Sequence, residues 1–216
     1  MNESYEDFRQ KKLEFKRLEN INLFWLEINK DKINKNVLEK INKKYIKYKN
    51  ILNENNIKNL EDYILYLKKS KLHILNLEIE PTRQNFDENL QIEYYNHKTL
   101  SFVKKLPGSG KNSVCFDKNN SKLCSTLDIK HGLKNRTKTF DAIYNDILFI
   151  FKHIEEPGGA QDNQFLDVLE QIKYCVQYNK LYEKKYFKVI LSGKYAENQI
   201  FKIKEFNDNY INILLL

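Results

Sequence analysis

The stretch that most constrains the fold is residues 139–154, "TFDAIYNDILFIFKHI". An Asn-Asp pair separates two apolar runs, and a two-residue turn of this kind between apolar runs predicts a β-hairpin. In such a hairpin Asp141 would lie opposite Ile150, and Thr139 opposite Lys152. Because opposed residues and positions two apart share a face, Asp141 and Lys152 are expected to project from the same side, close together.

The residues after the hairpin predict a helix and a further strand. "EEPGGAQDNQ" (155–164) begins with a Pro-Gly-Gly turn, and Asp162 or Asn163 is expected to cap the helix that follows. The helix should turn one apolar face inward, formed by Phe165, Val168, Leu169, Ile172, Cys175 (or Val176) and Tyr178. "YFKVILSGKY" (186–195) predicts a buried strand, "AENQIFKIKEF" a short helix, and "INILLL" a last strand or tail.

The N-terminal part has a different pattern. Between residues 36 and 54 an apolar stripe at three- and four-residue spacing predicts a helix, and its members are Leu38, Ile41, Tyr45, Tyr48 and Leu52. Asn59 is a plausible N-cap for a second helix. From about residue 90 the segments "QIEYYNH", "TLSFVKK" and "SVCFD" predict short strands. We expect a mainly helical region at 1–85 packed on a core at 86–216, with a single domain overall as the alternative.

Composition narrows the class of protein. With 41% hydrophobic and 31% charged residues the chain is globular. No apolar run reaches the roughly 20 residues of a membrane span, and the N-terminus has no export signal. Three cysteines form no metal or redox motif, so a cytoplasmic setting is expected. Cys115 and Cys124 are interpreted as two hairpin thiols and not as a disulfide.

Two basic loops precede the hairpin. "KKLPGSGKNS" (104–113) resembles a phosphate-binding loop, but Lys105 and Asn112 occupy the first glycine and the hydroxyl positions, so no nucleotide cofactor is expected. The net charge is +8, which favours an anionic partner such as nucleic acid. We expect the loops to contact DNA phosphates, with a solvated basic surface as the alternative. The expected contacts are Lys104, Lys105, Lys111, Asn112, Lys134, Arg136 and Lys138.

The charged pair of the hairpin has two interpretations. Asp141 and Lys152 both lie among apolar neighbours, where a charge is costly unless it is used or paired. A carboxylate beside an ammonium can bind Mg²⁺ and stabilise charge during phosphodiester hydrolysis. The simpler interpretation is a cross-strand salt bridge.

Together, Asp141, the strand "ILFIFKH", the loop "EEPGGAQDNQ", its helix and "YFKVILSGKY" resemble the core of type II restriction endonucleases of the PD-(D/E)xK nuclease superfamily. That core has an aspartate on one strand, acid-x-Lys on the next, a helix, and a further strand. The resemblance covers roughly residues 100–195. It implies an α/β (α+β) restriction-endonuclease-like core, with a mixed central sheet flanked by helices and an N-terminal helical region.

The resemblance also implies a function: Mg²⁺-dependent, site-specific cleavage of double-stranded DNA, by a homodimer. Asp141 would hold Mg²⁺ and Lys152 would stabilise developing charge. Gln161 and Gln164 would be accessory catalytic residues, and Asn163 would bind DNA. The alternative function is a non-catalytic, basic nucleic-acid-binding protein.

One position departs from the family pattern. The second acid should occupy position 150, where this chain has isoleucine, which binds no metal. Another acid could take its place, either Glu93, which we expect first, or one of Glu61, Glu155 and Asp162. Two further possibilities are a metal held by fewer protein oxygens and a degenerate site.

Overall fold

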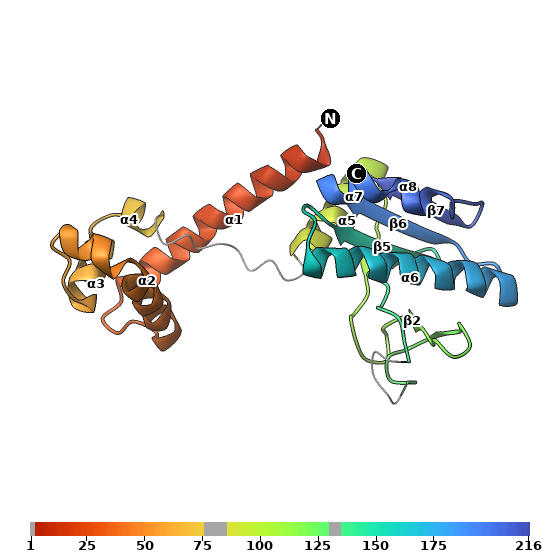
Figure 1. Cartoon of the computed structure of the whole chain (residues 1–216), viewed down its shortest axis with the longest axis horizontal. Coiled ribbons are helices and arrows are strands. Elements are labelled where there is room, and N and C mark those ends of the chain that lie inside the picture. Colours follow the sequence, from red (N-terminus) through yellow and green to blue (C-terminus); the bar gives the residue numbers. More distant parts are fainter. Residues whose placement is uncertain (1–2, 76–85, 130–134) are drawn as a thin grey trace. The chain divides into compact units, whose positions relative to one another are not determined.

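A computed structural model describes residues 3–75, 86–129 and 135–216, without the side chains of Ala160 and Gln161. The described residues divide into two compact units, one within residues 1–9 and 83–216 and the other within residues 10–82. We refer to the first as the sheet unit and to the second as the helical unit. Figure 1 shows the elements of each.

The sheet unit is built on a five-stranded mixed sheet with strand order β1-β4-β5-β6-β7. The strands are β1 (Lys104–Lys105), β4 (Ala142–Tyr144), β5 (Ile147–His153), β6 (Phe187–Ser192) and β7 (Ile211–Leu215). β4 is antiparallel to both of its neighbours, β1 and β5, whereas β6 and β7 continue the sheet in parallel with β5. The expected mixed sheet flanked by helices is therefore present.

The predicted hairpin is confirmed as β4 and β5. Its turn residues Asn145 and Asp146 both have positive φ, 45° and 66°, as the type I′ turn of two-residue hairpins requires. The ladder pairs Tyr144 with Ile147 and Ala142 with Phe149. The turn chemistry thus sets the register that places Asp141 and Lys152.

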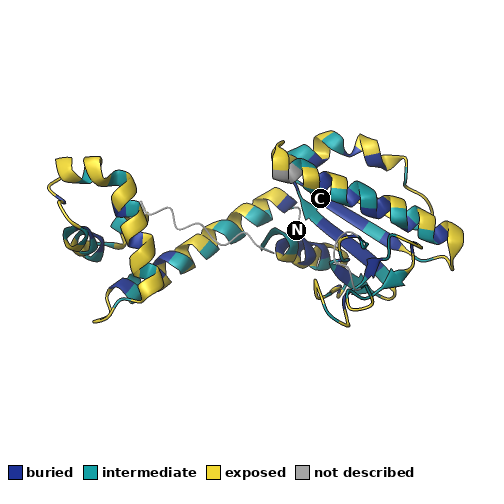
Figure 2. Cartoon of the chain, turned by 60° about the horizontal axis from the view of Figure 1, so that its bottom comes forward, coloured by how far each residue is buried: buried dark blue, intermediate teal, exposed yellow. Residues whose placement is uncertain are grey.

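Two helices cover opposite faces of the sheet. Residues Leu148 and Ile150 of β5 pack in one core cluster with α6 (Gly159–Leu181), and Phe149 and Phe151 pack in another with α5 (Phe86–Thr99). β5 and β6 are therefore buried on both faces and appear dark blue in Figure 2. This explains their nearly continuous apolar sequences.

The chain leaves β6 through a close approach of two backbones. Gly193 has φ +92°, and a Cβ at this position would lie 2.5 Å from the carbonyl oxygen of Ile154. Only glycine fits there without displacing the backbone. The short helices α7 (Lys194–Gln199) and α8 (Phe201–Lys204) follow, in the segment predicted to be helical, and "INILLL" forms β7 as expected.

A small hairpin, β2 (Cys115–Phe116) and β3 (Leu123–Cys124), completes the sheet unit. Cys115 and Cys124 are direct cross-strand partners, and their Sγ atoms lie 3.7 Å apart. Burial raises the pKa of both thiols, which disfavours the reactive thiolate. Their predicted place on a hairpin is confirmed.

The helical unit contains most of α1 (Tyr5–Ile28), α2 (Lys35–Glu54), α3 (Leu60–Lys69) and α4 (Lys71–Leu75). Its buried cluster is entirely apolar or aromatic: Ile21, Phe24, Ile28, Ile41, Tyr45, Ile57, Tyr63, Leu67 and Ile74. The predicted stripe of α2 supplies Ile41 and Tyr45, although Leu38 is 37% exposed. Asn59 caps α3 as predicted, its side chain accepting a hydrogen bond from the Asp62 amide.

Three sequence predictions are wrong. Residues 91–97 lie in helix α5, not in a strand, and "TLSFVKK" contributes only the two residues of β1. α5 packs on the sheet through Ile92 and Tyr95, and on Tyr5 and Phe8 through Leu90 and Tyr94. A helix buried on two sides has no single apolar stripe, so its sequence shows no clear helical period.

The third error concerns the start of α6. The helix begins at Gly159 with Gly158 as its N-cap, and Gly158 has φ +136° and provides no side-chain cap. Asp162 and Asn163 therefore lie inside the first turns and not at the cap. Among the described helices, none is both long enough and apolar enough to cross a bilayer.

Candidate active site

Asp141 lies where strand β4 separates from strand β5. Its amide donates to the carbonyl oxygen of Phe149 (2.9 Å), and its Oδ2 accepts a hydrogen bond from the amide of Phe151 (2.7 Å). On its other side, its carbonyl oxygen accepts from the amide of Leu106 (2.8 Å). The carboxylate thus takes the place of a backbone acceptor in the ladder, and its position is fixed by two neighbouring strands.

The separation begins immediately before Asp141. The amide of Phe140 donates to the carbonyl oxygen of Val114 (2.8 Å), and the amide of Thr137 donates to the carbonyl oxygen of Phe116 (3.0 Å). This segment therefore runs beside β2 and not beside β5. The predicted pairing of Thr139 with Lys152 is therefore wrong. Pairing stops because residues 137–140 satisfy their backbone groups with a different segment.

Lys152 projects from β5 on the side that faces α6, because it alternates with Phe151 and shares the face of Ile150. Its positive charge lowers the pKa of Asp141. Withdrawal of the carboxylate from water is the larger effect and raises the pKa of Asp141 to about 7. Among the described residues, no hydrogen bond or ion pair joins Asp141 directly to Lys152, and Asp141 holds its proton more tightly than an exposed aspartate.

A second carboxylate, Glu88 in the first turn of α5, acts on Asp141. Its charge raises the pKa of Asp141 further. Glu88 is 18% exposed and forms an ion pair of 2.7 Å with Lys105 of β1. Glu93, the acid expected first, lies further along α5 and is exposed.

Sequence reasoning missed Glu88 because residues 91–97 were taken as a strand. The available signal was the acidic pair Asp87-Glu88, because two acidic residues are typical of the first turn of a helix. Asp87 itself forms an ion pair of 2.8 Å with Arg9. Of the other acids considered, Glu155 is exposed and lies 3.5 Å from His153, and Glu61 belongs to the helical unit.

The donor set fits a magnesium ion held mainly by water and substrate. Mg²⁺ commonly takes only one or two protein carboxylates and completes its shell with waters and phosphate oxygens, and Asp141 and Glu88 supply that number. In the part of the chain that the structure describes, no group of three or more His, Cys, Asp or Glu side chains is arranged to hold a metal. The site therefore offers a sparse, oxygen-only ligand set next to two ammonium groups, Lys152 and Lys105.

A buried polar network supports the end of β5. Nε2 of Gln91 donates to the carbonyl oxygen of Lys152 (3.0 Å) and to Oγ of Ser192 (2.8 Å). Ser192 Oγ in turn lies 2.9 Å from Nδ1 of His153. Gln91 and Ser192 are fully buried. Burial lowers the pKa of His153, which favours the neutral ring.

His153 was predicted to alternate to the face opposite Lys152 and to pack or meet solvent. Its side chain is 5% exposed and its ring lies 6.1 Å from that of Tyr5, on the α5 side of the sheet. That prediction is confirmed. Gln91, by contrast, was not singled out, because its role depends on a helix that its sequence did not reveal.

The amide side chains of "GGAQDNQ" lie at the start of α6, which packs on the same face of the sheet as Lys152. Gln164 is half-buried and Asn163 is exposed. The side chain of Gln161 is outside the described residues. Among the groups described, no hydrogen bond joins Gln164 to Asp141 or Lys152.

The first basic loop is held by its own hydrogen bonds. Thr126 Oγ1 accepts from the amide of Gly110 (2.7 Å), and Ser113 Oγ donates to the carbonyl oxygen of Gly110 (2.6 Å). The Gly110 amide is thus already used and is not presented to a phosphate. Lys104, Lys111 and Asn112 are exposed.

The remaining predicted DNA contacts differ in setting. The Lys105 side chain binds Glu88 and Asn89 (2.7 Å), and that of Lys138 lies 3.8 Å from Asp167. Arg136 is paired with Asp117 through the backbone, in an isolated antiparallel β-bridge. Lys134 lies outside the described residues. Lys104, Lys105, Lys111 and Lys138 are the basic side chains of these loops that the structure describes as exposed.

Comparisons of the chain with protein-family models, with curated proteins and with solved structures gave no match.

Proposed function

We propose that the protein is a Mg²⁺-dependent endonuclease that cleaves double-stranded DNA at specific sites, in the manner of type II restriction enzymes. The observation that carries the proposal is the buried carboxylate of Asp141, which is fixed by the Phe151 amide of β5, the strand that also bears Lys152. The charges of Lys152 and Glu88 both act on the pKa of Asp141. An aspartate and a lysine on neighbouring strands, followed by a helix and a further strand, is also the arrangement that the sequence resemblance implies.

Each residue has a chemical role in this proposal. Asp141 and Glu88 would hold the metal, which would supply positive charge next to the scissile phosphate and lower the pKa of a water. Lys152 donates to the attacking hydroxide or to the developing negative charge on phosphorus. The network through Gln91 and Ser192 fixes the backbone of Lys152 and so the direction of its side chain.

Lys105 neutralises Glu88 when no metal is bound. Two carboxylates in a partly dehydrated site repel each other, and an ammonium group or a divalent cation relieves this repulsion. Metal binding would therefore release Lys105 from Glu88 and free it to contact a DNA phosphate. The homodimer is proposed because a two-fold protein matches a palindromic site most simply.

The test is digestion of a long, sequence-diverse DNA by the purified chain, with Mg²⁺ or with EDTA. Discrete Mg²⁺-dependent fragments are expected from the wild type. Lys152→Ala and Asp141→Asn should each reduce cleavage about 100-fold or more, because charge stabilisation is a large term in such reactions. The matched controls are Lys202→Ala and Asp146→Asn, at exposed positions away from the site.

Intact DNA under every condition would contradict the proposal for unmodified DNA. If salt-sensitive DNA binding then persisted, the protein would be a non-catalytic nucleic-acid-binding protein, which the net charge of +8 also favours.

A further inference from the structure

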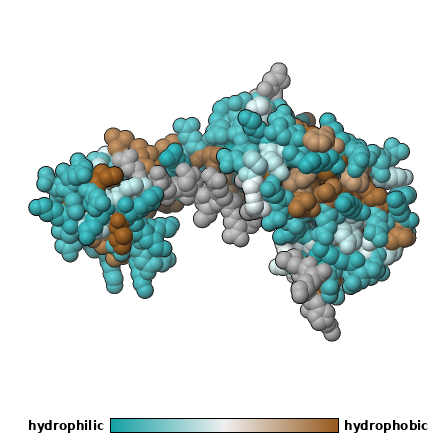
Figure 3. All heavy atoms as spheres, in the orientation of Figure 1, coloured by the Kyte–Doolittle hydropathy of each residue, from teal (hydrophilic) through white to brown (hydrophobic). Residues whose placement is uncertain are grey.

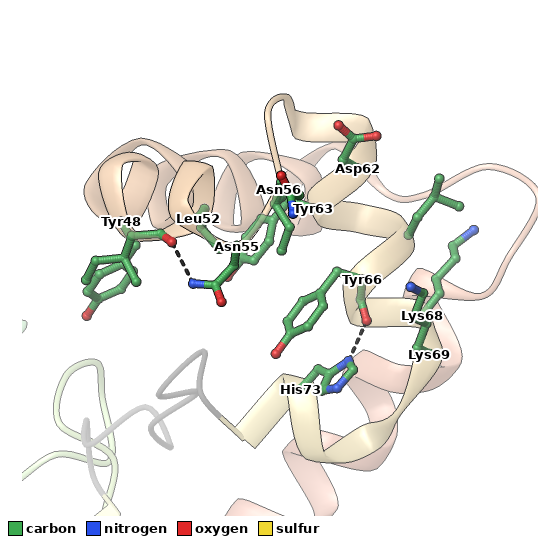
Figure 4. Close-up of a pocket in the computed structure, with 13 residues that line it drawn as sticks. Tyr48, Leu52, Asn55, Asn56, Asp62, Tyr63, Tyr66, Lys68, Lys69 and His73 are labelled. Carbon is green, nitrogen blue, oxygen red and sulfur yellow. Dashed lines mark hydrogen bonds between the residues drawn. The ribbon is translucent and has the colours of Figure 1, made fainter.

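The helical unit contains a pocket of about 950 Å³, bounded by the end of α2, the loop after it, α3 and α4. Its volume is near the upper end of the usual range for ligand sites, roughly 300–1,000 Å³. Figure 4 shows Tyr48 and Asn55 on one side of the pocket, with Tyr66 and His73 on the other. Nothing in the proposed cleavage chemistry uses it.

The pocket is lined by flat rings held in fixed orientations. Tyr66 and His73 stack with ring centroids 3.9 Å apart and an interplanar angle of 5°, and Tyr63 lies nearly parallel to Tyr66 (11°). Nδ1 of His73 is 2.6 Å from the carbonyl oxygen of Tyr66, which fixes the ring. These rings form a pre-organised stacking surface, so a planar ligand would pay little to order them.

Tyr48, on the facing helix, has an unusual backbone. α2 is kinked there, with φ −109° and ψ 16°, close to the sparsely populated bridge region in which many binding and active-site residues lie. Lys47 and Lys44 lie over its ring, at 4.9 and 5.9 Å from the centroid. The ring of Tyr48 therefore carries positive charge beside it.

The surroundings of the pocket are basic. Lys68 and Lys69 line it, and α2 contains six lysines against two glutamates. Asp62 is the one acid among the lining residues, and its carboxylate accepts from the amide of Lys58 (3.3 Å). Apolar side chains reach the surface of this unit among hydrophilic ones (Figure 3), and two of them, Ile51 and Leu65, line the pocket while about 60% exposed.

We propose that this pocket binds an unpaired nucleobase of a DNA strand. Planar aromatic faces beside lysines are the combination that binds single-stranded nucleic acid, with bases stacked on the rings and phosphates on the ammonium groups. Lys68 and Lys69 contact the flanking phosphates, and the Asn55 and Asn56 amides face the base edge. The pocket acts independently of the Asp141 site, since it needs neither metal nor cleavage.

The experiment uses the full chain in EDTA, so that no cleavage occurs, and a fluorescently labelled oligothymidine as the probe, with fluorescence anisotropy as the readout. Tyr48→Leu should weaken binding about tenfold, because one stacking contact is lost. Lys68→Gln combined with Lys69→Gln should weaken binding and reduce its salt dependence. The second variant changes only surface charge, so it tests the proposal even if Tyr48→Leu folds poorly.

Matched controls separate the pocket from general effects. Phe15→Leu removes an aromatic side chain of the same unit that is 69% exposed and outside the pocket. Lys32→Gln combined with Lys40→Gln makes the same change in net charge at two exposed positions away from the lining. Both controls should change the dissociation constant less than twofold.

A second readout reports stacking directly. An oligonucleotide with one 2-aminopurine should be quenched by the wild type and not by Tyr48→Leu. The proposal would be overturned if the pocket variants and the control variants lost affinity equally, or if all of them kept wild-type affinity. It would also be overturned if the pocket variants changed only the oligomeric state of the protein. Because EDTA is present, a failure here is distinct from a failure of DNA cleavage.

Discussion

In the sheet unit, polar side chains lie deep inside the fold, whereas the buried cluster of the helical unit holds only aliphatic, phenylalanine and tyrosine side chains. All the fully buried polar residues of the described chain belong to the sheet unit: Gln91, Ser113, Ser121, Thr137, Gln171, Asn179 and Ser192. A buried polar group costs free energy unless it is hydrogen-bonded. In the sheet unit, this free-energy cost arises close to Asp141 and Lys152. In the helical unit, the polar groups lie at the rim of the pocket.

The comparison suggests two kinds of site. In the sheet unit, withdrawal from water raises the pKa of Asp141, and perturbed pKa values are typical of sites that carry out chemistry. In the helical unit, exposed lysines beside fixed rings suit reversible binding. The single tryptophan, Trp25, packs against the helical cluster. Its fluorescence therefore reports on that unit, and the stability of the two units can be compared in one molecule.

The largest expected effect is on the sheet unit. Gly193→Ala places a Cβ 2.5 Å from a backbone oxygen at a residue with φ +92°, and we expect a loss of about 3 to 5 kcal/mol in its free energy of unfolding. Urea unfolding followed by circular dichroism measures it. Gly108→Ala is the control, because a Cβ there meets no atom within 4 Å.

If the two units unfold separately, the transition reported by Trp25 fluorescence should keep its midpoint in Gly193→Ala. A coincident shift of both transitions would show that the two units unfold as one cooperative system and would remove the basis for comparing their stabilities. A wild-type midpoint by circular dichroism would show that the backbone near Ile154 can move aside.

The next largest effect is the counterpart in the helical unit. Ile41→Ala removes a fully buried side chain from the apolar cluster and should cost about 2 to 4 kcal/mol, from lost burial and the cavity left behind. Here the Trp25 transition should shift to lower urea concentration. Ile46→Ala, at a position 64% exposed on the same helix, should leave it nearly unchanged, and equal shifts in the two variants would contradict the assignment of the core.

The sequence predicted those parts of the fold whose signal is local. The Asn-Asp turn predicted the hairpin, and the apolar run around Ile190 predicted a buried strand. α5 was not predicted, because it is covered by the sheet and by Tyr5, so its apolar residues show no stripe. Glu88 was missed with it, since its approach to Asp141 depends on how α5 packs, which no short segment encodes.

A third prediction concerns the pH dependence of the sheet unit. The pKa of Asp141 is raised in the folded state from 3.8 to about 7, so between these values the folded chain binds more protons than the unfolded chain. The contribution of protonated Asp141 to the free energy of unfolding is present below about pH 4 and is lost as the pH rises to about 7. Asp141→Asn removes this loss.

Relative to wild type, Asp141→Asn should therefore gain up to about 4 kcal/mol in stability between pH 4 and pH 8. Urea unfolding at three pH values checks it, and Asp146→Asn, at an exposed position, is the control. A difference that does not vary with pH would show that the carboxylate is well solvated or fully balanced by Lys152. Adding Mg²⁺ should reduce the difference, because a cation favours the ionised form.

The smallest expected effect is at the edge of the helical unit. The Asn59 side chain accepts a hydrogen bond of 2.8 Å from the Asp62 amide and so caps α3, and Asn59→Ala should cost about 1 kcal/mol. Asn59→Asp should retain the cap, whereas Asn42→Ala, at an exposed position inside α2, tests for unspecific effects. The Trp25 transition should shift only in Asn59→Ala. If Asn59→Ala also lowers the affinity for oligothymidine at low urea concentration, the cap holds the wall of the pocket that α3 provides. The binding site and the stability of this unit then depend on the same helix. Unchanged affinity would show that the stacked pair Tyr66–His73 keeps its geometry without the cap.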